Sequence, residues 1–197
     1  MTILNKYYLF YLLIIFSSEI SLSQTGVGRK YDSIKVNDNN FSKTNSENKN
    51  LVVNSHESKL IGKNAASFTY YSSDGQKISL KQYSDKILVL DFWESWCGKC
   101  ISSFKDINRI AIEYKDKGIE ILGITTENRK KVKNLIESYK LVYPNIYADK
   151  KIIRDYEVSS RPTYIIINEE GRIIFVSYGN LGVVEKKLKQ LTGSKTG

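Results

Sequence analysis

A nearly continuous apolar segment, Lys86–Trp93 (KILVLDFW), ends just before two cysteines, Cys97 and Cys100. An apolar run of this length is typical of a strand buried on both faces, as in the centre of a parallel sheet. Apolar residues then recur at helical spacing over Ile101–Ile112, and Gly118 follows as a helix terminator. The sequence therefore predicts a buried strand that leads directly into a long helix, with the two cysteines at the junction.

The rest of this region alternates between strand and helix patterns. Short strands over 68–71 and 77–80 are predicted around Asp74-Gly75, a pair that tolerates the positive φ of a tight hairpin. The other predicted elements are strands over 119–125, 146–148, 163–167 and 172–178, and helices over 132–139, 151–156 and 183–191. This order implies one α/β domain with a mixed central β-sheet flanked by helices on both faces.

The composition limits the function classes. The chain has 197 residues and a net charge of +9, and this basic excess would suit an acidic partner or a membrane surface. Because the charge is spread along the sequence, we interpret it first as a contribution to solubility. The basic run Arg129–Lys133 either docks an acidic partner or forms the solvated face of a helix. No pattern indicates nucleic-acid recognition, and two cysteines with one histidine, His56, cannot complete a four-ligand zinc site without carboxylates.

Residues 1–23 have the pattern of a signal peptide. Lys6 precedes the apolar run Tyr7–Phe16, which is well short of the roughly 20 residues needed to span a bilayer. Ser21 and Ser23 supply the small residues expected before a cleavage site at Gln24. We therefore expect an exported protein, periplasmic, in the cell envelope or secreted, with no stable membrane span after signal removal. An uncleaved anchor or a buried strand is the alternative.

A polar segment, residues 24–58, follows the predicted signal peptide. It is rich in Asn, Ser and Lys and buries too little apolar surface to offset its ordering entropy. We predict a disordered linker here, with Leu51–Val53 as the one candidate for a short strand. His56 lies in this segment and is interpreted as a solvated linker residue rather than a metal ligand. The folded domain is predicted to cover residues 59–197.

Redox chemistry is the strongest prediction for the cysteine pair. Because Cys97 and Cys100 are three residues apart in a first helical turn, they lie on one face of the helix. Their Cβ atoms would be about 5–6 Å apart, which is near the geometry that a disulfide requires. A helix N-terminus stabilises an anion, so Cys97 should be the attacking thiolate, with positive charge added by Lys99. Cys100 should be more buried and act as the resolving thiol. A purely structural disulfide would add little stability when it closes so short a loop, and a metal site built on the two cysteines would lack its other ligands.

The residues around this pair resemble a known family. Asp91–Cys100 (DFWESWCGKC) looks like the active-site segment of thioredoxins. The stretch from Ile61 onwards resembles their exported relatives, the TlpA/ResA-like thiol-disulfide oxidoreductases. The resemblance covers about Leu60–Leu191 and implies a thioredoxin-like fold with an N-terminal β-hairpin extension. Lys99 stands where the family commonly has proline, and a cation there should favour the thiolate and make the pair more oxidising.

A second segment, Val158–Thr163 (VSSRPT), matches the family segment that carries a cis-proline before a strand. By this resemblance Pro162 lies against the cysteine pair, and the backbone at Arg161 pairs with an extended substrate peptide. Trp96 and Pro162 would form an apolar platform for the substrate chain, and Gly98 and Lys99 are included among the predicted substrate-binding residues. The alternative for Pro162 is an ordinary loop proline.

Two acidic residues precede the cysteines. Asp91 interrupts the apolar strand, where an unpaired carboxylate is costly and its pKa should rise. Such a carboxylate near a thiol can take or return the proton of Cys100, and the matching thioredoxin aspartate implies that role here. An aspartate held by hydrogen bonds at the sheet rim is the alternative. We expect Glu94 to be more exposed than Asp91. It would either tune the reactivity of the cysteine pair or only solvate the loop.

The predicted function is thiol-disulfide exchange with cysteines of substrate proteins, weakly favouring a reductase supplied by an upstream electron donor. No cofactor is expected other than the redox-active Cys97–Cys100 disulfide, and no metal. A peroxiredoxin-like thiol peroxidase is the nearest alternative, but Glu94 stands where such sites usually carry Thr or Ser. A copper-delivery module is the other alternative, although related copper chaperones space their cysteines four apart and use a histidine within the domain.

Overall fold

In the computed structural model, which describes residues 58–193, the strands form one seven-stranded sheet in the order β2-β1-β5-β4-β3-β6-β7. The strands are β1 Thr69–Ser72, β2 Lys77–Ser79, β3 Ile87–Phe92, β4 Ile119–Thr125, β5 Asn145–Tyr147, β6 Thr163–Ile167 and β7 Ile173–Tyr178. The helices are α1 Gly98–Lys115, α2 Arg129–Ser138, α3 Lys150–Asp155, α4 Leu181–Gly193 and the short 3₁₀ helix η1 Leu80–Tyr83.

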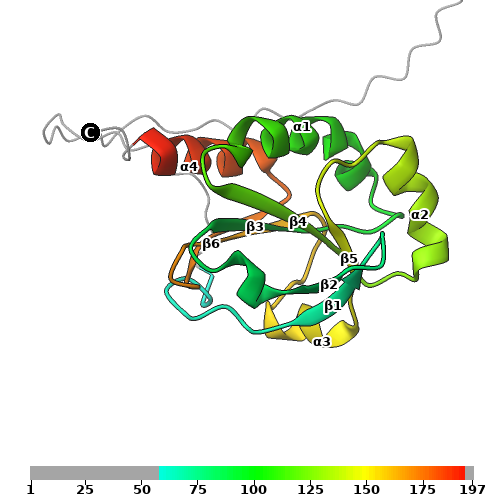
Figure 1. Ribbon diagram of the computed structural model, residues 1–197, viewed down its shortest axis with the longest axis horizontal. Helices are drawn as coiled ribbons and strands as arrows, with labels where there is room; N and C mark the ends of the chain where they lie inside the picture. The colour runs from blue at the N-terminus through cyan, green and yellow to red at the C-terminus, as the bar shows by residue number, and fades with distance from the viewer. Residues whose placement is uncertain (1–57, 194–197) are drawn as a thin grey trace, which may run out of the picture. The chain divides into compact units, whose positions relative to one another are not determined.

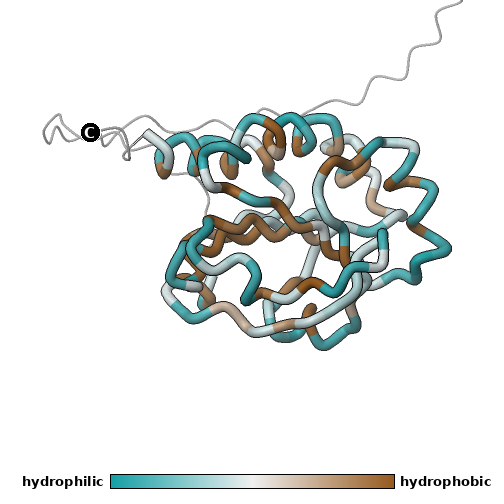
Figure 2. Tube along the Cα trace, in the orientation of Figure 1, coloured by the Kyte–Doolittle hydropathy of each residue, from teal (hydrophilic) through white to brown (hydrophobic). Residues whose placement is uncertain are grey.

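Strand β3 lies in the interior of the sheet, parallel to β4 and antiparallel to β6. All six of its residues are buried, as its apolar sequence predicts. Strands β4 and β6 are similarly apolar, so the most hydrophobic part of the chain runs through the middle of the sheet (Figure 2). Because the chain leaves β3 directly into α1, the cysteine pair is placed at the edge of the buried core.

Helices cover both faces of the sheet, as predicted, with α1 and α4 on one side and α3 on the other (Figure 1). Successive strand residues point to opposite faces. In β3, Leu88 and Leu90 pack in the cluster that includes α3, whereas Ile87 and Val89 pack against α1 and α4. Asp91 follows the second set and therefore projects from the face that α1 covers.

The predicted element boundaries differ from the observed ones in detail. Helix α1 ends at Lys115 rather than near Gly118, and α4 begins two residues before the predicted Val183. The sequence analysis missed η1, whose start is fixed where the Ser79 N–H donates to Gln82 Oε1 at 2.8 Å. The predicted signal peptide, the candidate strand Leu51–Val53 and His56 lie outside the described residues.

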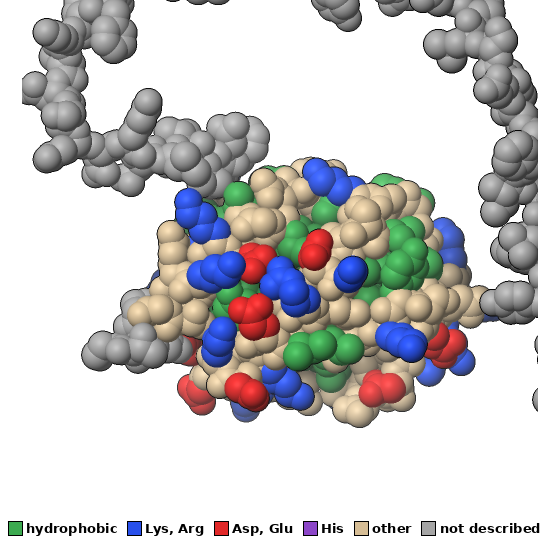
Figure 3. Space-filling view, turned by 90° about the horizontal axis from the view of Figure 1, so that it is seen from above, with side chains coloured by type: hydrophobic (Ala, Val, Ile, Leu, Met, Phe, Trp, Pro, Cys, Tyr) green, Lys and Arg blue, Asp and Glu red, His purple; other side chains and the backbone are tan. Residues whose placement is uncertain are grey.

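Basic and acidic side chains are interspersed on the face formed by α1 and α4 (Figure 3). Arg109 pairs with both Glu113 and Glu185, and Lys189 also pairs with Glu185. This interleaving favours the solvated-surface interpretation of the basic excess for that face. Within residues 58–193, no helix has both the length and the apolar character needed to cross a membrane.

Candidate functional site: a disulfide at the start of helix α1

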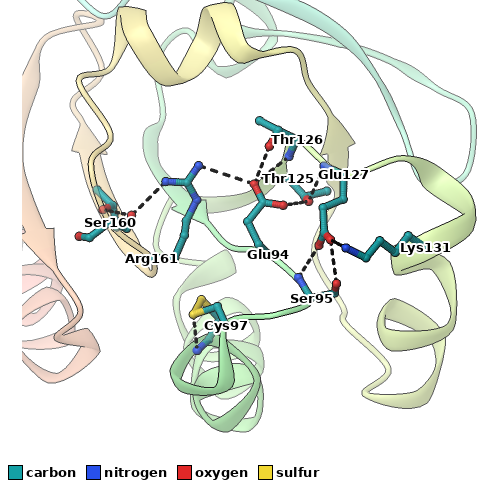
Figure 4. Close-up of polar contacts among 11 residues, drawn as sticks. Glu94, Ser95, Cys97, Thr125, Thr126, Glu127, Lys131, Ser160 and Arg161 are labelled. Carbon is teal, nitrogen blue, oxygen red and sulfur yellow. Dashed lines mark hydrogen bonds and ion pairs between the residues drawn. A yellow bond between two sulfur atoms is a disulfide. The ribbon is translucent and has the colours of Figure 1, made fainter.

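Cys97 and Cys100 form a disulfide at the N-terminus of α1, with 5.2 Å between their Cα atoms. Cys97 is the N-cap residue of the helix, and the Cys100 N–H donates to Cys97 Sγ at 3.1 Å (Figure 4). Unpaired N–H groups and the helix macrodipole favour negative charge at such a position. The same surroundings would favour a thiolate on Cys97 in the reduced protein.

The two cysteine residues differ in burial. Cys97 has an exposed fraction of 6% and Cys100 of 1%, so the order predicted from the sequence is confirmed. Both cysteines pack in a small apolar cluster with Trp93, Phe104 and Val132. Trp96 is 69% exposed beside them, and Gly98 and Lys99 are exposed as well. The cysteine pair therefore packs against the core on one side and is bordered on the other by exposed residues that a partner protein can contact.

The peptide bond between Arg161 and Pro162 is cis, as the family resemblance implies. Pro162 is buried immediately before β6, and its carbonyl accepts the Gly179 N–H at 2.8 Å. Gly179 has φ +70°, and a Cβ built on it would lie 3.1 Å from Lys99 Nζ. The turn after β7 thus touches both the proline segment and the first turn of α1. This connection brings Pro162 and Lys99 to the same end of the sheet.

Glu94 is buried, so the expectation of an exposed loop residue is wrong. Its exposed fraction is 2%, and one carboxylate oxygen accepts from Thr125 Oγ1 at 2.7 Å. The other accepts from the N–H and the Oγ1 of Thr126, at 3.1 and 2.8 Å, and lies 3.6 Å from Arg161 Nη2 (Figure 4). The carboxylate therefore joins the loop before α1 to the loop after β4 and to the proline segment.

Glu127 is a second anchor, which the sequence analysis did not identify. It accepts hydrogen bonds from the backbone N–H and the hydroxyl of Ser95 and pairs with Lys131 on α2 (Figure 4). Although burial raises the pKa of Glu127, the hydrogen bonds from Lys131 and Ser95 outweigh it and hold the pKa below its ordinary value. The only local signal is a glutamate four residues before a lysine at a helix start, which equally describes a surface ion pair.

Asp91 is buried, with an exposed fraction of 2%, on the sheet face that α1 covers. Burial raises its pKa to about 7, although a hydrogen bond from the Tyr143 hydroxyl to Asp91 Oδ2, at 3.2 Å, acts in the opposite direction. The raised pKa agrees with the sequence prediction. A carboxyl of this kind changes its charge near neutral pH, which is the property that a proton acceptor for a thiol needs.

The sequence matches the model of the AhpC/TSA family over residues 61–176. The chain belongs to this family. A curated relative, the thiol-disulfide oxidoreductase ResA of Bacillus cereus (strain ATCC 10987 / NRS 248), is 36% identical over 124 residues, which are 61% of this chain and 71% of the relative. ResA of Bacillus subtilis (strain 168) is 30% identical over 134 residues, 67% of this chain and 75% of the relative.

Solved structures of related proteins share the fold. A putative thiol:disulfide interchange protein DsbE from Chlorobium tepidum superimposes with a TM-score of 0.62 at 24% identity, covering 70% of this chain and 98% of that one. A putative protein disulfide isomerase from Bacteroides thetaiotaomicron gives a TM-score of 0.61 at 26% identity, covering 66% and 87%. With the cysteine pair in place, the protein is a thioredoxin-like thiol-disulfide oxidoreductase.

The buried ion pair leads to a stability prediction. Arg161→Met leaves the Glu94 carboxylate buried without its cation, so the free energy of unfolding should fall by about 3 kcal/mol. Adding Glu94→Gln should recover part of that loss, because the uncompensated charge is removed. Urea denaturation of the oxidised protein measures both effects. Arg109→Met breaks an exposed pair and should cost less than about 1 kcal/mol. Equal losses for the two arginine variants would contradict this account of the site.

The raised pKa of Asp91 leads to a second prediction. The folded protein keeps this carboxyl protonated up to about pH 7, whereas the unfolded chain ionises it near its ordinary pKa of 3.8. Stability is therefore lost as the pH rises through this window. Asp91→Asn removes the loss, so its stability relative to the unsubstituted protein should increase by about 4 kcal/mol between about pH 4 and pH 8. Denaturation of the oxidised proteins across that range is the test, and a difference that does not change with pH would refute it.

Proposed function

We propose that this oxidoreductase is exported and reduces disulfides in substrate proteins, with Cys97 as the attacking sulfur and Cys100 as the resolving one. The position of Cys97 carries the proposal, because its Sγ is the N-cap acceptor of α1 and Cys97 is the more exposed of the two cysteines. Export is supported by the sequence of residues 1–23 alone. Substrate disulfides persist in such a compartment, and an upstream dithiol would keep the Cys97–Cys100 pair reduced.

The reaction proceeds in two exchanges. The Cys97 thiolate attacks one sulfur of the substrate disulfide, and the bond between the two substrate sulfurs breaks. One substrate sulfur leaves as a thiolate and takes up a proton, while the other is held in a mixed disulfide with Cys97. Cys100 then gives its proton to Asp91 and attacks Cys97 Sγ. The second substrate sulfur is released reduced, and the Cys97–Cys100 disulfide is formed again. An upstream electron donor, which supplies two electrons, restores the dithiol.

The substrate chain would lie between Trp96 and Pro162. Trp96 offers an exposed aromatic surface, and Pro162 lies at the same end of the sheet through Gly179. The Arg161 side chain is only 9% exposed and already paired with Glu94, so the backbone at Arg161 is the better candidate for contact with an extended peptide. Gly98 and Lys99 complete the exposed border of the pair.

The surroundings of Cys100 support its role as the resolving thiol. Its sulfur is nearly inaccessible to solvent, so its proton needs an acceptor within the protein. Asp91 has the pKa for that task and lies on the face that α1 covers. A peroxidase reaction forms no mixed disulfide with a substrate protein that Cys100 would have to resolve. Consumption of hydrogen peroxide without any dithiol substrate would therefore favour the peroxidase alternative.

Single cysteine variants test the division of labour. Cys100→Ser should accumulate a mixed disulfide between Cys97 and a disulfide-containing substrate such as insulin, because the resolving thiol is absent. Cys97→Ser should give at least about tenfold less adduct, because its remaining thiol is buried. Mass spectrometry under non-reducing conditions measures both yields. Comparable adducts from the two variants would contradict the assignment, and no adduct from either would defeat the proposed function.

A further inference from the structure

Tyr143, just before β5, contacts the buried carboxyl of Asp91. Its hydroxyl donates to Asp91 Oδ2 at 3.2 Å, and the two residues have exposed fractions of 5% and 2%. Within residues 58–193, no other side chain forms a hydrogen bond or an ion pair with Asp91. No sequence motif includes Tyr143, and neither of the two exchange steps uses it.

The backbone around Tyr143 is fixed in place. The Asn145 side-chain amide donates to the Tyr143 carbonyl at 2.9 Å and accepts from Trp93 Nε1 at 2.8 Å. The Gly123 N–H donates to the Pro144 carbonyl at 2.9 Å. All three contacts are made close to the centre of the sheet, so the tyrosine ring approaches Asp91 from a segment with little freedom to move.

Gly123 makes this close approach possible. It is the register partner of Asp91 on the neighbouring strand β4. A Cβ at Gly123 would lie 2.7 Å from Asn145 Cγ, a distance that real Cβ atoms essentially never show. Asn145, the first residue of β5, thus occupies the space that a side chain at Gly123 would need, and Tyr143 lies two residues before it.

Other polar groups face Asp91 from the elements packed around it. From β6, its register partner is Tyr164, whose hydroxyl lies 3.2 Å from Ser103 Oγ on α1. The Ser103 hydroxyl donates to the Cys100 carbonyl at 2.8 Å, which links α1 to the same region. No lysine or arginine among the described residues pairs with Asp91, so Tyr143 is the group that offsets its burial.

We propose that Tyr143 is a positioning residue for thiol exchange: its hydroxyl orients Asp91 and stabilises the carboxylate form that takes the proton of Cys100. This inference rests on the proposed role of Asp91 and names the residue on which that role depends. Burial, together with the nearby Asp91, raises the pKa of Tyr143 well above its ordinary value, so the phenol keeps its proton and acts as a donor.

The proton balance is simple. Tyr143 holds Oδ2 by a hydrogen bond and transfers no proton itself. The Cys100 proton passes to the Asp91 carboxylate, the Cys100 sulfur attacks Cys97 Sγ, and the bond from Cys97 to the substrate breaks. The released substrate thiolate takes up a proton, and Asp91 later returns its own proton to solvent. Without the hydroxyl, a smaller fraction of Asp91 is ionised at neutral pH, so this step is slower.

Tyr143→Phe tests the inference, with Tyr164→Phe as a matched control. The control deletes another buried tyrosine hydroxyl near Asp91 that forms its hydrogen bond with Ser103 instead. The Asp91 carboxyl is titrated by ¹³C NMR in the oxidised full-length protein, in which neither cysteine titrates. Tyr143→Phe should raise the Asp91 midpoint by about one pH unit, because a hydrogen bond to a charged group is lost. Tyr164→Phe should leave it nearly unchanged. Equal shifts, or no shift in Tyr143→Phe, would overturn the proposal.

Kinetics separate this inference from the proposed function. The rate of substrate release from the mixed disulfide is followed against pH in the unsubstituted protein, Tyr143→Phe and Asp91→Asn. Tyr143→Phe should be about fivefold slower at pH 7 and should recover at higher pH, since its acceptor ionises about one unit later. An Asp91→Asn profile like that of the unsubstituted protein would sink the proton role of Asp91 itself. If substrate release is slow in Asp91→Asn but unaltered in Tyr143→Phe, only the role of Tyr143 is contradicted.

Discussion

The hydrogen bond from the Cys100 N–H to Cys97 Sγ fixes where α1 begins, and the arrangement of the site follows from that starting point. Because the sulfur itself is the cap, the helix N-terminus is aimed at the atom that is proposed to carry the negative charge in the reduced protein. The buried strand β3 ends five residues earlier, so it sets the position of the helix as well as that of Asp91. The redox chemistry and the fold therefore share one short segment.

Two buried carboxyl groups in this segment, Asp91 and Glu94, serve different purposes because their surroundings differ. Glu94 is matched by Arg161 and by hydrogen bonds from Thr125 and Thr126, so its charge is compensated and it acts as an anchor between loops. Among residues 58–193, the Asp91 carboxyl accepts one side-chain hydrogen bond, from Tyr143, and its pKa rises to about 7. Partners decide which carboxylate holds the structure together and which can exchange a proton.

Local patterns in the sequence predicted the fold and the cysteine pair because both depend on short-range spacing. The apolar run of β3, the two cysteines three residues apart and the proline before β6 are each contained in a few neighbouring residues. The burial of Asp91 was predictable for the same reason, since a carboxylate within an apolar strand has no local route to solvent.

The partners of these residues were not predictable in the same way. Glu94 lies in a loop, and its burial depends on Thr125, Thr126 and Arg161 arriving from other parts of the chain. Glu127 has the local pattern of a surface pair, and Tyr143 that of an ordinary core aromatic. Only the pairing of Glu94 with Arg161 leaves a signal in the sequence, namely a charged residue near the cysteines and an arginine beside the cis-proline. It becomes informative only when the family resemblance places those two segments together.

The reduction potential of the Cys97–Cys100 couple tests the central claim most directly. Equilibration of the protein with dithiol buffers of known potential, followed by quantification of free thiols, gives this value. A reversible couple near that of thioredoxin, about −270 mV, is the predicted result for a reductase. A potential above about −180 mV, in the range of protein oxidants, or a pair that does not exchange electrons at all, would contradict the account.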